Sequence, residues 1–323
     1  MARRRTSALG VVGGLLVALT CGGGGTGETA GPLSGQSLYA DPDSSARRQL
    51  AAYEAEGRTA LAEQLRPLAQ EPTATWFTGD PPRAAAQRLT TAAAATGSLP
   101  VLVAYDIPDR DCGSQSAGGA ADGAAYLDWI RELAAGIGDR PAVVVLEPDA
   151  IPLSITGCPH LDPRARYGLL RQAVEVLTAL PQTHVYLDAG HPDWVQDLPV
   201  LAVALQASGI DRAAGFSLNV SNFETTAANV AYGRRLSKLS GGAHFVVDTS
   251  RNGSGAPDTG DEFAWCNPAG ATIGRVPSTS TGERLVDAWL WVKRPGESDG
   301  ACRPGEPAAG EWWPEYALAL SAV

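Results

Sequence analysis

Short apolar runs alternate with stretches of helical periodicity along this chain, and no other feature of the sequence constrains the fold as much. The runs are rich in Val, Leu and aromatic residues and are apolar at almost every position. They are Ala74–Phe77, Pro100–Tyr105, Ala142–Glu147, His184–Asp188, Ala214–Asn219, Ala243–Asp248 and Asp287–Lys293. Such runs are typical of strands that are buried on both faces of a parallel sheet.

Helical patterns separate these runs and cover Pro82–Ala95, Gly123–Ile137, Pro163–Leu180 and Ala227–Leu239. Alternating strands and helices predict βα units with right-handed crossovers. The seven runs favour an α/β fold in which a parallel, TIM-like β/α barrel is closed or nearly closed. The 323 residues, 44% of them apolar, suffice for one large domain. We place it at residues 36–323, because no further linker or repeat follows Ser37.

Polar residues recur where these strands end. In chain order they are Tyr105, Asp106, Glu147, Asp149, Asp188, Asn219, Asp248 and Lys293. The carboxyl ends of the strands carry the chemistry of parallel α/β barrels. Helix N-caps would explain a single polar residue at such a position. Their recurrence at nearly every strand end instead favours a carbohydrate site.

The first 35 residues have the pattern of an export signal and a linker. Arg3–Arg5 precede an apolar run over residues 8–20, which is shorter than the roughly 20 residues that span a bilayer. This pattern predicts a signal peptide over residues 1–21. The Gly-rich residues 22–35 are expected to form a flexible linker.

Cys21 leaves two alternatives open for the exported protein. A Cys directly after the apolar run indicates lipid anchoring at the cell surface, although Ala18 stands where such sites usually have Leu. The alternative is an ordinary signal peptide that is cut between Ala18 and Ala30, which predicts a secreted protein. In either case we expect no membrane contact except through a lipid on Cys21.

Composition and cysteine content exclude several functions. The net charge of −10 disfavours nucleic acid, whose phosphates require a basic face. We predict no metal and no cofactor, because the chain has no Cys-x-x-Cys and its His residues lack ligand spacing. Export favours disulfides, and three pairings are open to the four remaining cysteines. These are Cys112, Cys158, Cys266 and Cys302.

Two acidic segments are candidates for acid–base chemistry. Asp106, Asp109 and Asp111 crowd around Arg110, so that neighbouring anions raise a carboxyl pKa while the guanidinium lowers it. Asp149 lies just past a buried strand, beside Pro148. Poor hydration there would raise its pKa and suit it to protonate a leaving oxygen, although a loop-capping role is the alternative.

Several motifs in this chain resemble glycoside hydrolase family 6, which contains endoglucanases and cellobiohydrolases. The resemblance runs from about Leu38 to the C-terminus. It rests on Tyr105–Cys112, Glu147–Ala150, Tyr186–His191, Asp248–Gly253, Trp265–Cys266 and Lys293–Gly300. It implies a distorted parallel barrel, hydrolysis of β-1,4-glucosidic bonds with inversion, and pairing of Cys112 with Cys158 and of Cys266 with Cys302.

The resemblance also implies roles for individual residues. Asp149 would be the general acid, and Asp111 would raise its pKa and relay the proton of the attacking water. Tyr105 would press against the sugar at subsite −1, and Asp299 is the candidate general base. Sugar subsites would be lined by Asp188, His191, Asn222, Lys293 and Glu297, with stacking platforms from Trp76, Trp194 and Trp265.

One segment departs from the family pattern. Where the family has a Ser before Gly-Gly or Asn-Gly in a mobile loop, this chain has Ala117 before Gly118-Gly119, and Ser116 stands one place early. That Ser helps to hold the attacking water in the family. Either a small shift of the loop lets Ser116 substitute for it, or the water is held less well.

These features predict a monomeric, inverting endo-β-1,4-glucanase that acts on cellulose or a related β-glucan. Internal cutting is favoured over an exo-acting cellobiohydrolase, because the chain lacks long insertions that would roof the cleft. A non-catalytic or weakly active glucan-binding surface protein is an alternative, favoured by Ala117 and Cys21. A preference for mixed-linkage β-glucan or xyloglucan also stays open.

Overall fold

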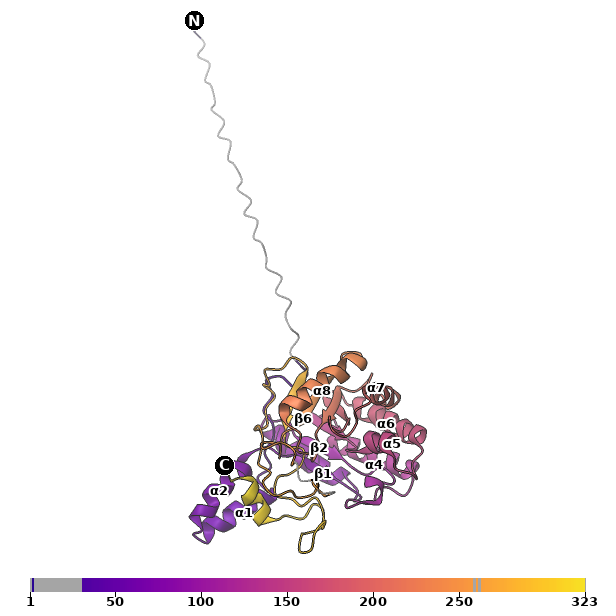
Figure 1. Ribbon diagram of the computed structural model, residues 1–323. Coiled ribbons are helices and arrows are strands. Elements are labelled where there is room, and N and C mark those ends of the chain that lie inside the picture. The colour runs from indigo at the N-terminus through magenta and orange to yellow at the C-terminus, as the bar shows by residue number, and fades with distance from the viewer. Residues whose placement is uncertain (1, 3–30, 258–259, 261–262, 323) are drawn as a thin grey trace.

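Seven parallel strands form one sheet in the computed structural model, which describes residue 2 and residues 31–257, 260 and 263–322 (Figure 1). The strands pair in chain order from β1 to β7. They are β1 (Thr75–Phe77), β2 (Val101–Ala104), β3 (Ala142–Leu146), β4 (Thr183–Asp188), β5 (Gly215–Leu218), β6 (His244–Asp248) and β7 (Val286–Leu290). Each lies in or next to a predicted apolar run. The edges of the sheet also meet, since the N–H of Ala74 donates to the carbonyl of Trp291 at 3.0 Å. The prediction of a distorted, nearly closed parallel barrel is therefore confirmed.

The strands read as nearly continuous apolar runs because both of their faces are buried. In β3, Val143 and Val145 belong to the cluster inside the barrel. Val144 and Leu146 alternate with them and pack against the surrounding helices. Successive side chains of a strand point to opposite faces, so two apolar layers leave no polar position.

Helices surround the sheet. The four predicted helical patterns correspond to α3 (Arg83–Ala95), α4 (Gly123–Ile137), α6 (Pro163–Thr178) and α8 (Thr226–Leu239). The sequence did not predict α1 (Ser45–Ala55), α2 (Thr59–Gln70), α5 (Ala150–Thr156), α7 (Leu198–Ala207), α9 (Pro314–Leu320) and the 3₁₀ turn η1 (Asp111–Gly113). Figure 1 shows α4 to α7 on one flank, and α1 and α2 near the C-terminus on the other.

The folded domain begins earlier than predicted. Leu33, expected in the flexible linker over residues 22–35, is 0% exposed and packs into the cluster inside the barrel. Gly31 lies so close to Asp287 that a side chain at this position would clash with its carboxylate. Residues 1–30, apart from Ala2, lie outside the described residues. They include the predicted signal peptide over residues 1–21 with Cys21, and the predicted linker up to residue 30.

Two disulfides join the four cysteines in the sequential pairing. They are Cys112–Cys158 and Cys266–Cys302, which agrees with the pairing that the resemblance implies. In the part of the chain that the structure describes, no helix has the length and apolar character needed to cross a membrane.

Candidate active site

A groove of about 830 Å³ opens where the barrel strands end. All four predicted catalytic residues line it: Tyr105, Asp111, Asp149 and Asp299. So do seven of the predicted sugar-binding residues, which are Trp76, His191, Trp194, Asn222, Trp265, Lys293 and Glu297. Residues up to 234 positions apart in the chain, from Trp76 to Gly310, are thus brought to one surface.

Asp188 is the exception among the predicted site residues. Its side chain is 1% exposed, and it does not contribute to the groove lining. Its carboxylate instead accepts the N–H of Asp149 at 2.9 Å and the hydroxyl of Ser217 at 3.1 Å. Asp188 therefore lies behind Asp149 and holds its backbone. The family resemblance had instead implied a place for Asp188 on a sugar subsite.

Asp188 is one of several buried carboxylates that fasten neighbouring loops together at the strand ends. Each accepts backbone N–H groups from the segment that follows an adjacent strand. The pairs are Asp106 with Gly79 at 2.9 Å, Glu147 with Asp106 at 3.0 Å and Ile107 at 3.1 Å, Asp188 with Asp149 at 2.9 Å, and Asp248 with Ser221 at 3.0 Å and Lys293 at 2.9 Å. The polar strand ends thus divide into residues that line the groove and residues that hold its loops, a division that the sequence pattern did not indicate.

Asp149 combines a strained backbone with a poorly hydrated carboxyl group. It links β3 to α5 with a φ of 70°, which is uncommon for a residue other than Gly. Burial raises the pKa of Asp149 well above the usual range, and the negative charges of Asp188 and Asp111 raise it further. This setting favours the protonated form of the carboxyl group, which suits it to donate a proton.

Asp111 faces the groove from the η1 turn. Its carboxylate accepts the N–H of Ser116 at 2.7 Å. Burial raises the pKa of Asp111, while the Ser116 N–H and the Arg110 guanidinium oppose that rise. Asp111 is thus better stabilised as an anion than Asp149, so the two carboxyl groups are suited to opposite proton-transfer roles.

Arg110 organises this side of the groove, a role that the sequence had not assigned to it. Its guanidinium lies over the Tyr105 ring, 4.8 Å from the centroid, and donates to the Tyr105 carbonyl at 2.7 Å. It also donates to the carbonyls of Ser116 at 2.7 Å and Ala117 at 3.2 Å. Tyr105 packs edge-on against Trp76 with centroids 5.3 Å apart. Arg110 thereby ties the loop that contains Ser116 to the Tyr105 ring.

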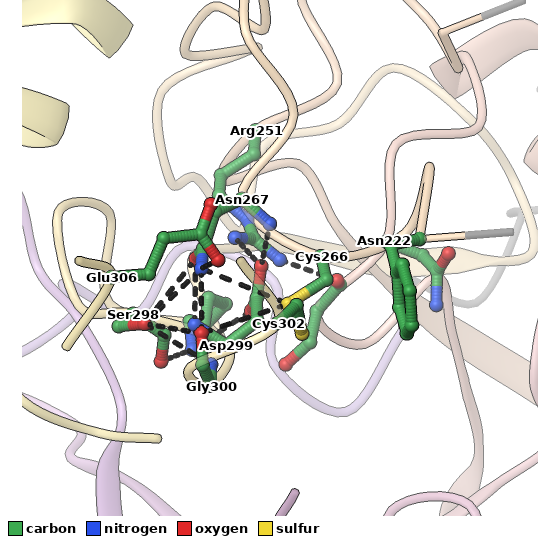
Figure 2. A network of polar contacts seen from close by, with 12 residues as sticks. Asn222, Arg251, Cys266, Asn267, Ser298, Asp299, Gly300, Cys302 and Glu306 are labelled. Atoms are coloured by element: carbon green, nitrogen blue, oxygen red, sulfur yellow. Dashed lines mark hydrogen bonds and ion pairs between the residues drawn. A yellow bond between two sulfur atoms is a disulfide. The ribbon is translucent and has the colours of Figure 1, made fainter. Parts of the chain in front are cut away.

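Asp299 also lines the groove and lies in a dense polar network (Figure 2). One carboxylate oxygen accepts from Arg251 Nη1 at 2.6 Å and from the Asn267 N–H at 3.0 Å. The other is 3.0 Å from Lys293 Nζ. Burial alone would raise the pKa of Asp299, but Arg251 and Lys293 outweigh it and hold the pKa at about 2. An anion held by two cations is a weak proton acceptor.

Arg251 is a functional residue that the sequence reasoning missed. Its side chain is fully buried beneath Asp299, with the guanidinium 4.4 Å from the centroid of the Phe223 ring. The signal was its place three residues after Asp248, where a buried strand ends. A cation in that setting requires an anionic partner. No pattern in the sequence identifies Asp299, 48 residues away, as that partner.

The remaining groove residues combine aromatic faces with fixed charges. Burial lowers the pKa of His191 to about 4 against the opposing charge of Asp193, so its ring is neutral. That ring lies 5.8 Å from Trp194, and Trp265 is 42% exposed. Glu297 pairs with Arg294 at 2.9 Å. Neutral rings and exposed Trp faces suit an uncharged polymer with hydroxyl groups.

The structure offers little for a metal ion among the described residues. One cluster of potential ligands consists of Cys266, Cys302 and Glu306. Both sulfur atoms are joined in the second disulfide, so neither can act as a thiolate ligand.

A groove at the carboxyl ends of a parallel barrel, lined by a carboxyl group of raised pKa, a carboxylate of lowered pKa and aromatic faces, defines a glycoside hydrolase. The family model described as Glycosyl hydrolases family 6 matches residues 33–322, and the chain belongs to this family.

Two relatives and one solved structure illustrate the similarity. The chain is 44% identical over 295 residues to Endoglucanase 1 of Streptomyces halstedii, covering 88% of each protein. It is 42% identical to Endoglucanase A of Cellulomonas fimi, where the match covers 90% of this chain and 61% of that protein. Its structure resembles the endoglucanase Cel6 of Mycobacterium tuberculosis, solved in complex with a methyl-cellobiosyl-4-deoxy-4-thio-β-D-cellobioside, with a TM-score of 0.83. That match has 44% identity and covers 90% and 98% of the two chains.

Proposed function

We propose that this protein is an inverting endo-β-1,4-glucanase that hydrolyses internal bonds of cellulose or a related β-glucan. The observation that carries the proposal is a groove-lining Asp149 whose pKa is raised by burial and by two neighbouring anions. The names of the relatives support the endoglucanase activity, and the family inverts the anomeric configuration. The thio-cellobioside bound to the mycobacterial enzyme supports a cello-oligosaccharide as the ligand of this groove.

In this mechanism Asp149 acts as the general acid. Its proton passes to the glycosidic oxygen as the bond from that oxygen to the anomeric carbon breaks. A water molecule attacks the opposite face of the sugar and forms the new bond, which inverts the configuration. The excess proton of that water leaves through Asp111, whose anionic form is stabilised by Arg110 and the Ser116 N–H.

Asp299 takes a different role from the general base that the resemblance suggested. With a pKa of about 2 and two cationic partners, it has little tendency to accept a proton. We propose that it orients Lys293 and Arg251 on the groove wall. Ser116, which lines the groove, takes the water-holding place that Ala117 cannot fill.

Substrate contacts follow from the groove lining. Trp76, Trp194 and Trp265 supply aromatic faces for glucose rings. Asn222, His191 and Glu297 supply hydrogen-bonding groups for hydroxyls. Aromatic faces and hydrogen-bonding groups occur together along one groove, which favours a chain of several sugars over a single sugar as the ligand.

End-wise release of cellobiose is a second candidate, which one contact favours. Gln115 lies so close to Gly300 that a Cβ there would be 2.6 Å from its side-chain oxygen. The loop after Asp111 thus reaches the wall that contains Asp299, as a partial roof would. We still favour internal cutting, because the named relatives described above are endoglucanases.

We also propose that the protein is exported and acts as a monomer outside the cell. The basic and apolar pattern of residues 1–21 supports export, and Cys21 supports anchoring by a lipid. Export is consistent with the two disulfides, which persist in oxidising compartments.

The test compares wild-type protein with Asp149→Asn on a soluble β-1,4-glucan. We expect rapid loss of viscosity per reducing end released, and an α-anomer as the first product by NMR. The variant should lose roughly 100- to 10,000-fold in kcat, the usual contribution of a general acid, while still binding the glucan. Asp139→Asn, an exposed position before β3, is the matched control.

Each alternative has its own signature in this experiment. Slow viscosity loss per cut would identify an exo-acting enzyme, and a β-anomer as the first product would rule out inversion. Binding by the wild type without hydrolysis would identify a non-catalytic glucan-binding protein.

A further inference from the structure

Glu147 is a buried carboxylate that the proposed mechanism does not use. It is 1% exposed, does not line the groove and has a φ of 48°. Its two oxygens accept the N–H of Asp106 at 3.0 and 3.1 Å, and one of them also accepts the N–H of Ile107 at 3.1 Å. Both donors belong to the short segment that joins Tyr105 to Asp111.

Arg166 grips the same segment from a different element. It belongs to α6, is 5% exposed, and donates from Nη2 to the carbonyl of Pro108. The negative charge of Glu147 is the largest influence opposing the effect of burial on the pKa of Arg166. Two buried side chains, from the end of β3 and from α6, thus hold three consecutive residues by their backbone.

The position of this pair in the chain links the two proton-transfer residues. Asp149 follows Glu147 by two residues, with the rigid Pro148 between them. The segment that Glu147 holds begins directly after Tyr105 and ends three residues before Asp111. A displacement of Glu147 would therefore change the position of Asp111 relative to Asp149.

We propose that Glu147 and Arg166 are positioning residues for the reaction, which hold the Asp106–Pro108 backbone so that Tyr105 and Asp111 stay in place beside Asp149. This inference rests on the proposed glucanase function. Buried ionisable side chains are seldom needed for stability alone, because apolar residues of similar volume usually stabilise a fold as well or better. The hydrogen bonds that join Glu147 and Arg166 to three successive residues of an active-site segment indicate a role in positioning that segment.

The titratable groups around Glu147 and around Asp149 determine how a variant would change the pKa of Asp149. Glu147 faces Asp106 after β2, Tyr126 on α4 and Arg166 on α6. Burial raises its pKa to about 8, against the N–H groups of Asp106 and Ile107 and the hydroxyl of Tyr126. Asp149 faces Asp188 and Asp111, and both raise its pKa. Moving Asp111 away would therefore lower the pKa of Asp149.

The decisive variant is Glu147→Gln, assayed on soluble β-glucan beside the wild type. Gln keeps the shape but turns an NH₂ group toward backbone N–H donors, so the segment shifts. We expect kcat to fall by roughly 100-fold, the loss that a misplacement of about 1 Å can cause, with KM little changed. The alkaline limb of the kcat–pH profile should move to lower pH. Glu175→Gln, exposed on α6, is the matched control.

Arg166 provides a second, independent test in case Glu147→Gln does not fold. Arg166→Met should reproduce the loss of kcat and the shift of the pH profile, while Arg166→Lys should restore part of both by keeping a charged donor. Arg164→Met, an exposed position on the same helix, is the control. Retention of wild-type kcat and pH profile by a folded Glu147→Gln or Arg166→Met would overturn the inference. A wild type without hydrolytic activity would instead overturn the proposed function, and this inference with it.

Discussion

Backbone strain in this protein is concentrated around the groove. Non-glycine residues with positive φ include Asp111 at 56°, Glu147 at 48°, Asp149 at 70° and Asn267 at 44°. Each such conformation costs on the order of 1–3 kcal/mol and persists only when surrounding contacts enforce it. Asp188 supplies one such contact by accepting the N–H of Asp149. The side chains of the site thus extend from backbone conformations that an unfolded chain rarely adopts.

Removing the Asp299 carboxylate should damage stability rather than delete a base. In Asp299→Ala, Arg251 and Lys293 lose the anion that both contact. Breaking a buried ion pair on one side typically costs about 3–5 kcal/mol, which urea denaturation would measure. Azide should fail to restore activity, because no proton acceptor has been removed. Rescue by azide with a glycosyl azide product would instead assign the base to Asp299.

The Cys112–Cys158 disulfide ties together the two elements that present Asp111 and Asp149. Cys112 follows Asp111 in η1, and Cys158 lies just beyond the end of α5, the helix that begins after Asp149. The second disulfide, Cys266–Cys302, instead braces the loops on either side of the Asp299 network (Figure 2). The two bridges therefore support different segments of the lining of one groove.

Loss of either bridge should lower stability by a similar amount. The bridged residues are 46 and 36 positions apart, and the chain-entropy model gives about 4 kcal/mol for loops of this size. We expect Cys112→Ser/Cys158→Ser to shift the kcat–pH profile as well, because Asp111 is freed. Cys266→Ser/Cys302→Ser, measured by the same denaturation and activity assays, should leave the pH limb set by Asp149 in place. Identical pH profiles for the two double variants would contradict the different roles assigned to the two disulfides.

Buried acids shape the behaviour of the molecule as a whole. Burial raises the pKa of Glu147 from its ordinary 4.5 to about 8 and that of Asp188 from 3.8 to about 6. Because these folded-state values exceed the unfolded ones, their contribution to stability is complete at acidic pH and is lost as pH rises through them. Asp299 acts in the opposite direction, since its pKa is lowered to about 2; its contribution is lost as pH falls toward that value.

Thermal stability should therefore peak at mildly acidic pH, between about 4 and 5, and decline toward pH 8. Differential scanning calorimetry across this range would measure the decline. The Glu147→Gln variant should show a shallower decline, because one of the raised pKa values is removed. A melting temperature that does not change across the same range would contradict the assignment.

The strands were predictable because burial on both faces leaves a continuous apolar signature, as in Ala142–Leu146. Some helices were not, for local reasons. In α7 (Leu198–Ala207) apolar residues fall on every side, including the exposed Val200 and Val203, so no periodicity marks it. The helix α2 (Thr59–Gln70) contains Pro67, a residue that is disfavoured inside helices. Both helices are stabilised by tertiary packing that overrides local preference.

The order of the strands and of four helices, the family motifs and the crowding of acidic groups around Asp111 can be read from the residues, because each depends on neighbours close in the chain. What Asp188 and Asp299 do cannot be read in this way. Asp188 is buried behind Asp149, and Asp299 is held by Arg251 and Lys293. Burial and ion pairing depend on distances between segments that meet only when the barrel closes, so folding alone sets the charge and hydration of these carboxyl groups.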